Sequence, residues 1–207
     1  MLPPFGDELE ARVRANLAVH PRLDVPLEGR RHAAVAVTLV AGDDGAPCFV
    51  LTRRAPRLRA HAGQWALPGG RVESHETAVE GALRELVEEV GLAATPAHVL
   101  GCLDDYPTRS GYVITPVVVW APDSAELRPQ PGEVSAIHRV PLTVLEHPDV
   151  PHLRTIPESD RPVISIAMVE THVHAPTAAI VYQLREVALH GRATRVDHFE
   201  QPVFAWR

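Results

Sequence analysis

The feature that most constrains the fold is a capped, amphipathic helix that the sequence predicts between Thr77 and Gly91. Thr77 and Glu80, three positions apart, form the pattern of a capping box, and glycine is the residue type that most often ends a helix. At about 100° per residue, one side of this helix is apolar. Its apolar side chains are Val79, Ala82, Leu83, Leu86 and Val90. We therefore expect this side to pack against another element of the core.

The same helix carries three glutamates, Glu85, Glu88 and Glu89, on a narrow arc beside its apolar side. Carboxylates at these spacings repel one another by roughly a few tenths of a kcal/mol per pair, so the arrangement favours a cationic partner. Arg84 can pair with Glu88, which leaves the other two glutamates without a partner on the helix. Three oxygen donors on one face suit a hard divalent cation that takes its remaining ligands from water and a phosphate group. A solvated acidic surface is the alternative interpretation.

The acidic helix belongs to a longer pattern that resembles the signature of the Nudix hydrolases. Gly70, then Glu76 after five residues, then the run from Arg84 to Leu92 after seven more, agree with that signature at every specified position. The resemblance implies an α/β fold, the Nudix α/β/α sandwich with a mixed β-sheet between helices. It also implies hydrolysis, with Mg²⁺ or Mn²⁺, of a nucleoside diphosphate linked to another group. The signature does not identify the substrate.

The resemblance implies roles for individual residues as well. The implied metal ligands are the backbone carbonyl of Gly69 and the three helix carboxylates of Glu85, Glu88 and Glu89. Arg84 would orient a glutamate by hydrogen bonding, and Glu76 would support the loop and the helix rather than bind the metal. The general base stays open between Glu85 and Glu133.

The segment before the helix, residues 51–70, resembles an added signature of one Nudix subgroup, the coenzyme A pyrophosphatases. The residues that match at the expected spacing are Leu51, Thr52, Arg53, Leu58, Arg59, His61, Gly63, Gln64, Pro68, Gly69 and Gly70. Arginine forks suit phosphate oxygens. The substrate contacts that the resemblance implies are Arg53, Arg59, His61 and Gln64. The chain departs from the subgroup pattern at Trp65, at Leu67 and at Ala175-Pro176, where a Trp-Gly pair is usual.

These patterns leave three functions open. The leading prediction is hydrolysis of coenzyme A or an acyl-CoA to 3',5'-ADP and (acyl-)phosphopantetheine. The departures from the subgroup pattern keep open the same reaction on ADP-ribose, NADH or another dinucleotide. The third is a Nudix domain that senses a nucleotide without cleaving it, and the complete glutamate set argues against it.

Composition narrows the class of partner. A chain of 207 residues, 45% hydrophobic, is expected to form a single domain over residues 1–207. The net charge of −6 argues against nucleic acid, whose backbone favours a basic surface. No stretch approaches the ~20 apolar residues that span a bilayer, and the N-terminus lacks a basic segment followed by an apolar run. We therefore expect a cytoplasmic protein that binds a small nucleotide and no membrane.

Outside the motif, the hydrophobic pattern predicts a helix at about 7–19 and a C-terminal helix with an aromatic tail at about 177–207. The predicted strands lie at 32–40, 48–52, 99–103, 112–121, 133–142 and 163–170. Residues 146–161 are expected to form a long loop, as a lid or a dimer arm, and the N-terminal helix to cover an edge or a homodimer contact. Pro116 favours an edge strand or a bulge. His172 and His174 are expected to be a surface pair rather than a metal site.

Overall fold

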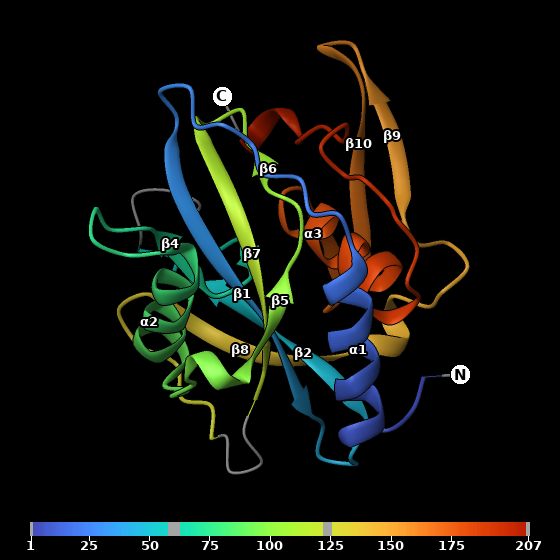
Figure 1. Cartoon of the computed structure of the whole chain (residues 1–207). Helices are drawn as coiled ribbons and strands as arrows, with labels where there is room; N and C mark the ends of the chain where they lie inside the picture. Colours follow the sequence, from blue (N-terminus) through green and yellow to red (C-terminus); the bar gives the residue numbers. More distant parts are fainter. Residues whose placement is uncertain (1, 58–62, 122–125, 206–207) are drawn as a thin grey trace.

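The computed structural model describes residues 2–57, 63–121 and 126–205, and its centre is a mixed eight-stranded β-sheet (Figure 1). Five strands cross the sheet in the order β3-β2-β1-β7-β5, while β4 pairs with β1, β6 with β7 and β8 with β2. The strands are β1 (Arg31–Ala41), β2 (Pro47–Arg54), β3 (Trp65–Ala66), β4 (Gly69–Arg71), β5 (Val99–Cys102), β6 (Tyr106–Pro107), β7 (Tyr112–Trp120) and β8 (Val134–Pro141). Because β1 and β7 are parallel and the pairs around them are antiparallel, the predicted mixed sheet is confirmed.

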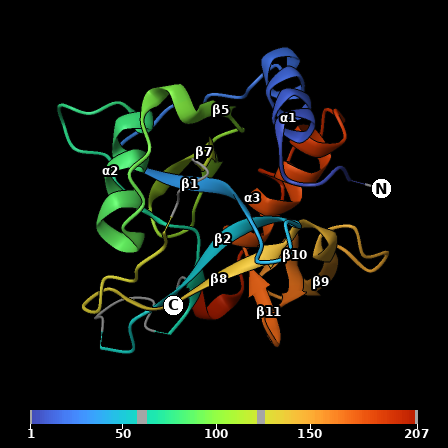
Figure 2. The same cartoon turned by 90° about the horizontal axis from the view of Figure 1, so that it is seen from below.

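Helices cover both faces of this sheet, as Figures 1 and 2 show. The helices are α1 (Asp7–Val19), α2 (Ala78–Val90) and α3 (Thr177–Gln183), the last continuing as a π-helical segment (Leu184–Leu189). Neighbouring residues of a strand point to opposite faces. In β7, Val117 and Val119 accordingly pack in the hydrophobic cluster of α2, whereas Val118 and Trp120 pack in the cluster of α1 and α3. Two cores on opposite faces of one sheet confirm the α/β/α sandwich.

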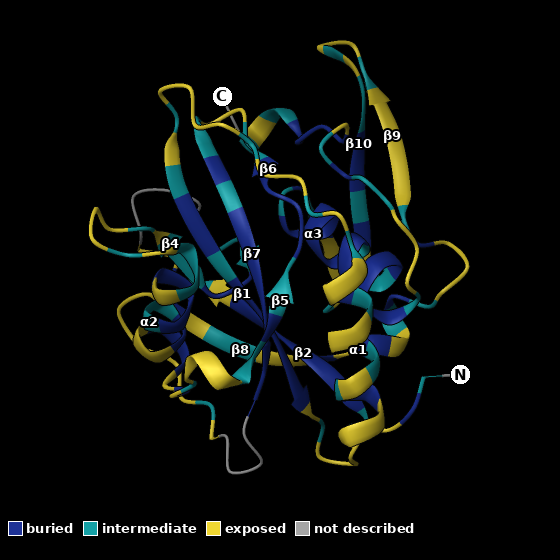
Figure 3. Cartoon of the chain, in the orientation of Figure 1, coloured by how far each residue is buried: buried dark blue, intermediate teal, exposed yellow. Residues whose placement is uncertain are grey.

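A separate three-stranded antiparallel sheet packs beside α3. It has the order β11-β10-β9, with β9 at His152–Ile156, β10 at Ser159–Met168 and β11 at Thr171–His174. The prediction of a long loop over 146–161 is wrong, because β9 and the start of β10 lie within it. Figure 3 shows the reason: β9 is exposed along most of its length, so it lacks the alternation of a half-buried strand.

Pro116 lies inside the main sheet and not at its edge. One side of β7 pairs with β1, where Val35 lies opposite Pro116. On the other side, β5 pairs as far as Val117 and β6 resumes at Ile114, and between these strands the Leu103 N–H still donates to the Pro116 carbonyl at 3.0 Å. Of the two expectations, the edge position is wrong, whereas an irregularity in the β5–β7 pairing lies close by, between Val99 and Gly101.

The C-terminal tail closes part of the core. Gly191, with φ of 67°, follows the π-helical segment, and Phe199 further on is buried in the cluster of α1 and α3. Cys48 and Cys102 are free thiols. Within the described residues, every helix is too short or too polar to cross a bilayer.

Candidate active site

Helix α2 carries the predicted acidic cluster, and its ends are fixed as its sequence predicts. The Thr77 hydroxyl accepts a hydrogen bond from the backbone N–H of Glu80 at 3.2 Å, and the Glu80 carboxylate accepts one from the backbone N–H of Thr77 at 2.7 Å. Gly91 ends the helix in the left-handed region, with φ of 69°. Leu86 and Val90 are fully buried against the sheet. The helix therefore presents its glutamates at a defined angle beside β4.

Two glycines of β4 let the backbone approach those glutamates. A methyl group on Gly69 would lie 2.4 Å from the carbonyl oxygen of Ala34 on β1, and one on Gly70 would lie 2.2 Å from Oε1 of Glu85. At Gly69 the clash is with backbone and leaves no room for a side chain, whereas at Gly70 the carboxylate end of Glu85 would have to move away. The glycines thus bring the β4 backbone and the α2 carboxylates into direct contact, and the Gly69 N–H donates to Oε2 of Glu89 at 3.1 Å.

Glu89 is the most deeply buried carboxylate of the cluster, with 3% of its surface exposed. Burial raises its pKa to about 7, although the hydrogen bond from Gly69 and the charge of Arg54 act in the opposite direction. The guanidinium of Arg54 lies 3.6 Å from Oε1 of Glu89, and its buried Nε has no hydrogen-bond partner within the described residues. The site therefore holds a carboxylate whose negative charge is only partly compensated.

Arg84 holds the remaining carboxylates in place. Its Nε donates to Glu76 at 2.7 Å, and one terminal nitrogen donates to both Glu85, at 2.9 Å, and Glu88, at 2.8 Å. The other terminal nitrogen donates to the backbone carbonyl of Arg71 at 3.0 Å. One guanidinium thus ties the loop before α2 to two glutamates of the helix, and it lowers the pKa of Glu76.

Glu85 and Glu133 are the two candidates for the general base. Burial raises the pKa of Glu85 despite its hydrogen bond from Arg84. Glu133 is exposed in the turn before β8, and its charge contributes to the raised pKa values of Glu85 and Glu89. All three carboxylates therefore face a common region.

The donor set fits a hard divalent cation. Glu85 and Glu89 are oxygen donors whose ionised forms are disfavoured by burial, and a bound cation would favour those forms. Among the described residues, no three His, Cys, Asp or Glu side chains already form a metal-binding group. Glu88, which is 53% exposed at its side chain, is turned to Arg84. Mg²⁺ or Mn²⁺ is the type of ion that these carboxylates suit.

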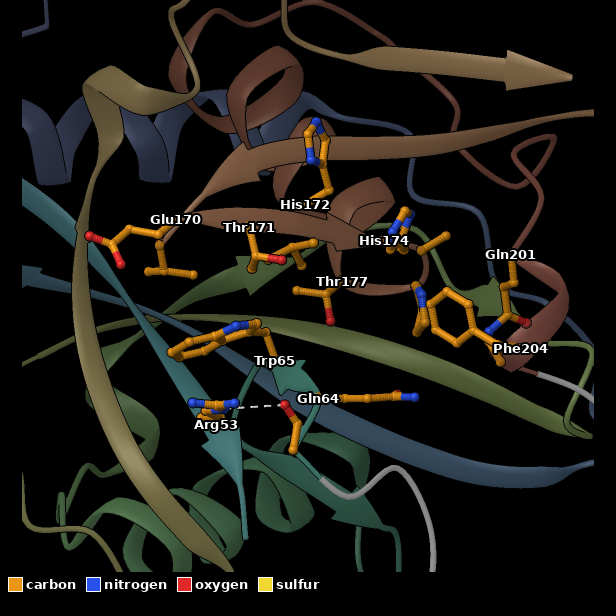
Figure 4. Close-up of a pocket in the computed structure, with 16 residues that line it drawn as sticks. Arg53, Gln64, Trp65, Glu170, Thr171, His172, His174, Thr177, Gln201 and Phe204 are labelled. Carbon is orange, nitrogen blue, oxygen red and sulfur yellow. Dashed lines mark hydrogen bonds between the residues drawn. The ribbon is translucent and has the colours of Figure 1, made fainter. Parts of the chain in front are cut away.

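A pocket of about 450 Å³ lies on the other side of β2 from the acidic cluster (Figure 4). One wall comes from Arg53, Gln64 and Trp65, and the other from β11, the residues that join it to α3, and the C-terminal tail. Arg53 donates to the carbonyl of Gly63 at 3.3 Å, and its guanidinium carbon lies 5.7 Å from the centre of the Trp65 ring.

The predicted substrate residues are only partly placed. Arg53 and Gln64 line this pocket together, whereas Arg59 and His61 lie outside the described residues. Trp65 and Ala175-Pro176, where the sequence departs from the coenzyme A signature, line the same pocket. Leu67, the other departure, is buried in the core.

Sequence reasoning missed three residues of this region. Arg54 contacts Glu89 while its neighbour Arg53 lines the pocket, and the alternation of a strand was the signal that could have separated them. His174 is half-buried in the pocket, so the expected surface pair holds only for the exposed His172. Phe204 of the tail lines the pocket as well, and no local pattern connects it to a site 140 residues earlier.

The sequence profile of the NUDIX domain matches residues 30–163 of this chain. A protein described as an uncharacterized Nudix hydrolase, NudL, of Yersinia enterocolitica is 40% identical over 112 residues, which are 54% of this chain and 56% of the relative. The Escherichia coli O6:H1 protein of the same description is 37% identical over 130 residues, 62% of this chain and 67% of the relative. The chain thus matches between half and about two thirds of the length of these relatives.

Among solved structures, a MutT/nudix family protein from Enterococcus faecalis superposes with a TM-score of 0.50 and 14% identity, over 82% of this chain and 64% of that one. At that level of identity the likeness concerns the fold alone.

Proposed function

Because this chain belongs to the Nudix family, we propose that it hydrolyses the pyrophosphate bond of a nucleoside diphosphate derivative, with coenzyme A or an acyl-CoA as the leading substrate. The products would be 3',5'-ADP and (acyl-)phosphopantetheine. The protein would act in the cytoplasm, and its substrate would be a small nucleotide.

The observation that carries the proposal is the acidic cluster, where Glu85 and Glu89 lie partly uncompensated against the glycine backbone of β4. Glu85, Glu88, Glu89 and the carbonyl of Gly69 would hold Mg²⁺ or Mn²⁺. When bound, the cation supplies charge neutralisation at the phosphates and a more acidic water.

The chain's own residues would supply position and proton transfer. Arg84 holds the carboxylates of Glu85 and Glu88 by hydrogen bonds, and Glu85 lies beside Gly70 of β4. The oxygen of a water molecule forms a bond to one phosphorus while the bridging P–O bond on that phosphorus breaks. The carboxylate of Glu85 or Glu133 accepts the proton of the water. Arg53, which lines the pocket, would contact phosphate oxygens, whereas Arg54 faces Glu89 on the other side of β2.

Coenzyme A is supported by the signature of residues 51–70 and by the position of Arg53 and Gln64 in one pocket. A second candidate, the same reaction on ADP-ribose or NADH, is favoured by a specific observation. Trp65 and Pro176, which differ from the coenzyme A pattern, line that same pocket, so its lining departs from that pattern.

A substrate panel tests the proposal. The full chain is incubated at pH 8 with 5 mM Mg²⁺ or Mn²⁺ and with coenzyme A, acetyl-CoA, ADP-ribose, NADH and a nucleoside triphosphate, and products are separated by chromatography. We expect the highest kcat/KM for coenzyme A or acetyl-CoA, with 3',5'-ADP as one product. A preference for ADP-ribose or NADH would select the second candidate, and binding without turnover of any compound would favour a nucleotide sensor.

A further inference from the structure

Two exposed arginines of the main sheet, Arg31 and Arg71, lie against the ring of one tyrosine. The guanidinium carbon of Arg31 is 4.1 Å from the centre of the Tyr112 ring, and that of Arg71 is 5.9 Å away. The Nε of Arg71 also donates to the Tyr112 hydroxyl at 3.3 Å. We infer that these three residues form a site for a phosphate monoester on the ribose of the substrate, separate from the pyrophosphate at the acidic cluster. The identity of the ligand as a nucleotide rests on the proposed function.

Strand pairing brings the three side chains together. Arg31 at the start of β1 lies opposite Tyr112 at the start of β7, and Ala33, two residues further along β1, lies opposite Arg71 of β4. Opposite residues, and residues two apart in one strand, point to the same face of a sheet. Because β1 and β7 are parallel, both strands begin at the same end of the sheet (Figure 1). The group is therefore fixed by the regular sheet and not by a loop.

The positive charges of this group are not compensated. Within the described residues neither Arg31 nor Arg71 has a carboxylate within ion-pair distance, whereas the neighbouring Arg30 pairs with Glu28 at 3.2 Å. The two guanidinium carbons are no more than about 10 Å apart, since both lie close to one ring. An aromatic ring holds a cation against its face but carries no net charge. Two like charges at this separation repel, and an anion bound between them would compensate both.

A phosphate monoester is the anion that suits this group. A guanidinium offers a planar fork of N–H donors to phosphate oxygens, and the tyrosine hydroxyl can donate a further hydrogen bond. A phosphate monoester carries a charge of about −1.5 to −2 near pH 7, which matches two arginines. Each phosphate of a pyrophosphate diester carries a single negative charge, and the cation at the acidic cluster would neutralise it.

The arginine pair lies close to the acidic cluster. Arg71 follows Gly69 by two residues, so their Cα atoms are roughly 7 Å apart along β4. The Arg71 carbonyl accepts a hydrogen bond at 3.0 Å from Arg84, whose guanidinium also holds Glu85 and Glu88. The backbone of Arg71 is thus tied directly to the group that holds these carboxylates.

A ligand can extend from the cluster to the arginines. Helix α2 packs on the opposite face of the sheet from Arg71, but in the described part of the chain β4 pairs only with β1, and its other edge is free of strand pairing. In a nucleoside diphosphate the ribose is bonded directly to the phosphates at the cluster. A second phosphate on the 2' or 3' oxygen of that ribose therefore lies one sugar away, at the distance that separates Arg71 from Gly69. Arg31 and Arg71 would distinguish such a ribose from one that carries only hydroxyl groups.

Calorimetric titration of the full chain with 3',5'-ADP, 2',5'-ADP and 5'-AMP, in EDTA, tests the proposal. We expect one bisphosphate to bind at least roughly 10-fold more tightly than 5'-AMP, because it alone reaches the arginine pair. Preference for 3',5'-ADP identifies a 3'-phosphate, as in coenzyme A, and preference for 2',5'-ADP identifies a dinucleotide that carries a 2'-phosphate.

Substitutions of the two arginines assign this preference to them. Arg31→Gln and Arg71→Gln should each weaken binding of the preferred bisphosphate roughly 10-fold and leave 5'-AMP within about twofold of wild type. Tyr112→Phe, which keeps the ring and removes the hydroxyl that holds Arg71, should weaken it about threefold. Arg12→Gln removes the same charge from an ion pair on α1 and is the matched control, with wild-type binding of all three nucleotides. Circular dichroism verifies that each variant is folded.

Three outcomes of the titrations overturn the monoester site. They are equal affinity of the wild-type chain for all three nucleotides, bisphosphate affinity within about twofold of wild type in both arginine variants, and an equal loss of 5'-AMP and bisphosphate binding. The last result would assign the arginines to the 5'-phosphate.

Kinetics separate this site from the proposed function. If the chain cleaves coenzyme A, the ratio of its kcat/KM to that of dephospho-coenzyme A should fall roughly 10-fold in Arg71→Gln. Cleavage of coenzyme A with the same ratio in wild type and in both arginine variants keeps the hydrolase and removes the monoester site. A chain that cleaves no dinucleotide but binds a bisphosphate through Arg31 and Arg71 keeps the site and loses the hydrolase proposal.

Discussion

The acidic cluster and the pocket beside Arg53 lie on either side of β2, and they are built in different ways. The acidic cluster comes from one stretch, Gly69 to Glu89, in which a glycine strand and a capped helix position each other. The pocket takes its residues from β2, β3, β11 and the tail, which are far apart in the sequence. The difference teaches that the glutamates of the implied metal site are specified locally, whereas the lining of the pocket depends on how distant segments of the chain assemble.

The largest effect is expected from Glu88→Gln in the acidic cluster. The substitution removes one oxygen donor of the implied metal site, and we expect kcat/KM on the best substrate to fall roughly 100-fold or more. Because the Glu88 side chain is 53% exposed, the unfolding free energy should change by no more than about 0.5 kcal/mol. Steady-state kinetics and urea unfolding measure the two quantities.

The matched control for that prediction is Glu80→Gln on the same helix. It also removes one carboxylate, and glutamine at this position keeps the capping box with Thr77. If the kcat/KM of Glu88→Gln lies within a few-fold of that of Glu80→Gln, Glu88 is not a metal ligand.

The raised pKa of Glu89 predicts that the stability of the metal-free chain depends on pH. Its pKa of about 7 in the folded chain lies above the ordinary value of 4.5, so the folded state favours the protonated acid. Its stabilising contribution is therefore complete below pH 4.5 and is lost as the pH rises through 7, by about 3 kcal/mol. Urea unfolding in EDTA should show this loss between pH 4.5 and 8 for wild type and not for Glu89→Gln.

Excess Mg²⁺ at pH 8 sharpens this test. If Glu89 is a metal ligand, Mg²⁺ stabilises the ionised form and restores the lost free energy in wild type, with a much smaller effect in Glu89→Gln. If the free energy of unfolding varies with pH in the same way for wild type and Glu89→Gln in EDTA, the burial of Glu89 does not cause the pH dependence of stability.

A smaller effect is expected from the tail that forms one wall of the pocket. Glu200 is buried, and burial acts to raise its pKa, but hydrogen bonds from Arg109, the backbone N–H of Gln201 and the Ser159 hydroxyl lower it to about 2. A lowered pKa means that this contribution to stability is present above pH 4.5 and is lost as the pH falls toward 2. With Arg109 half-exposed, we expect Glu200→Gln to lose about 2 kcal/mol at pH 7 and to converge with wild type near pH 2.

The same variant links the tail to the pocket. Because Glu200 anchors the segment that carries Phe204, Glu200→Gln should raise KM about threefold and leave kcat unchanged. Glu8→Gln, which breaks the exposed pair with Arg12, is the control and should change neither stability nor KM. An unchanged KM in Glu200→Gln would mean that the tail does not contribute to ligand binding.

Much of the fold was predictable because its signals are local. The capping box of Thr77 and Glu80, the apolar side of α2 and the apolar runs of β1 and β7 each depend on neighbours within a few residues. The exposed strand β9 was not predictable, because its stability comes from pairing with β10 and leaves no apolar pattern in its own sequence. For Pro116 the sequence could not decide between an edge strand and a bulge, because the change from β5 to β6 beside it is a property of two other strands.

The sequence alone determined the acidic helix, its caps and the adjacent glycines, since helix geometry places residues three and four apart on one face. Only the tertiary structure decided the surroundings of these groups. It buries Glu89 against Gly69, gives Arg84 four acceptors, and separates Arg53 from Arg54 across β2. It also brings His174 and Phe204 into the same pocket as Trp65, because this arrangement requires the second sheet and the tail to lie beside the main sheet. The local periodicity of a sequence does not predict which distant segments come together.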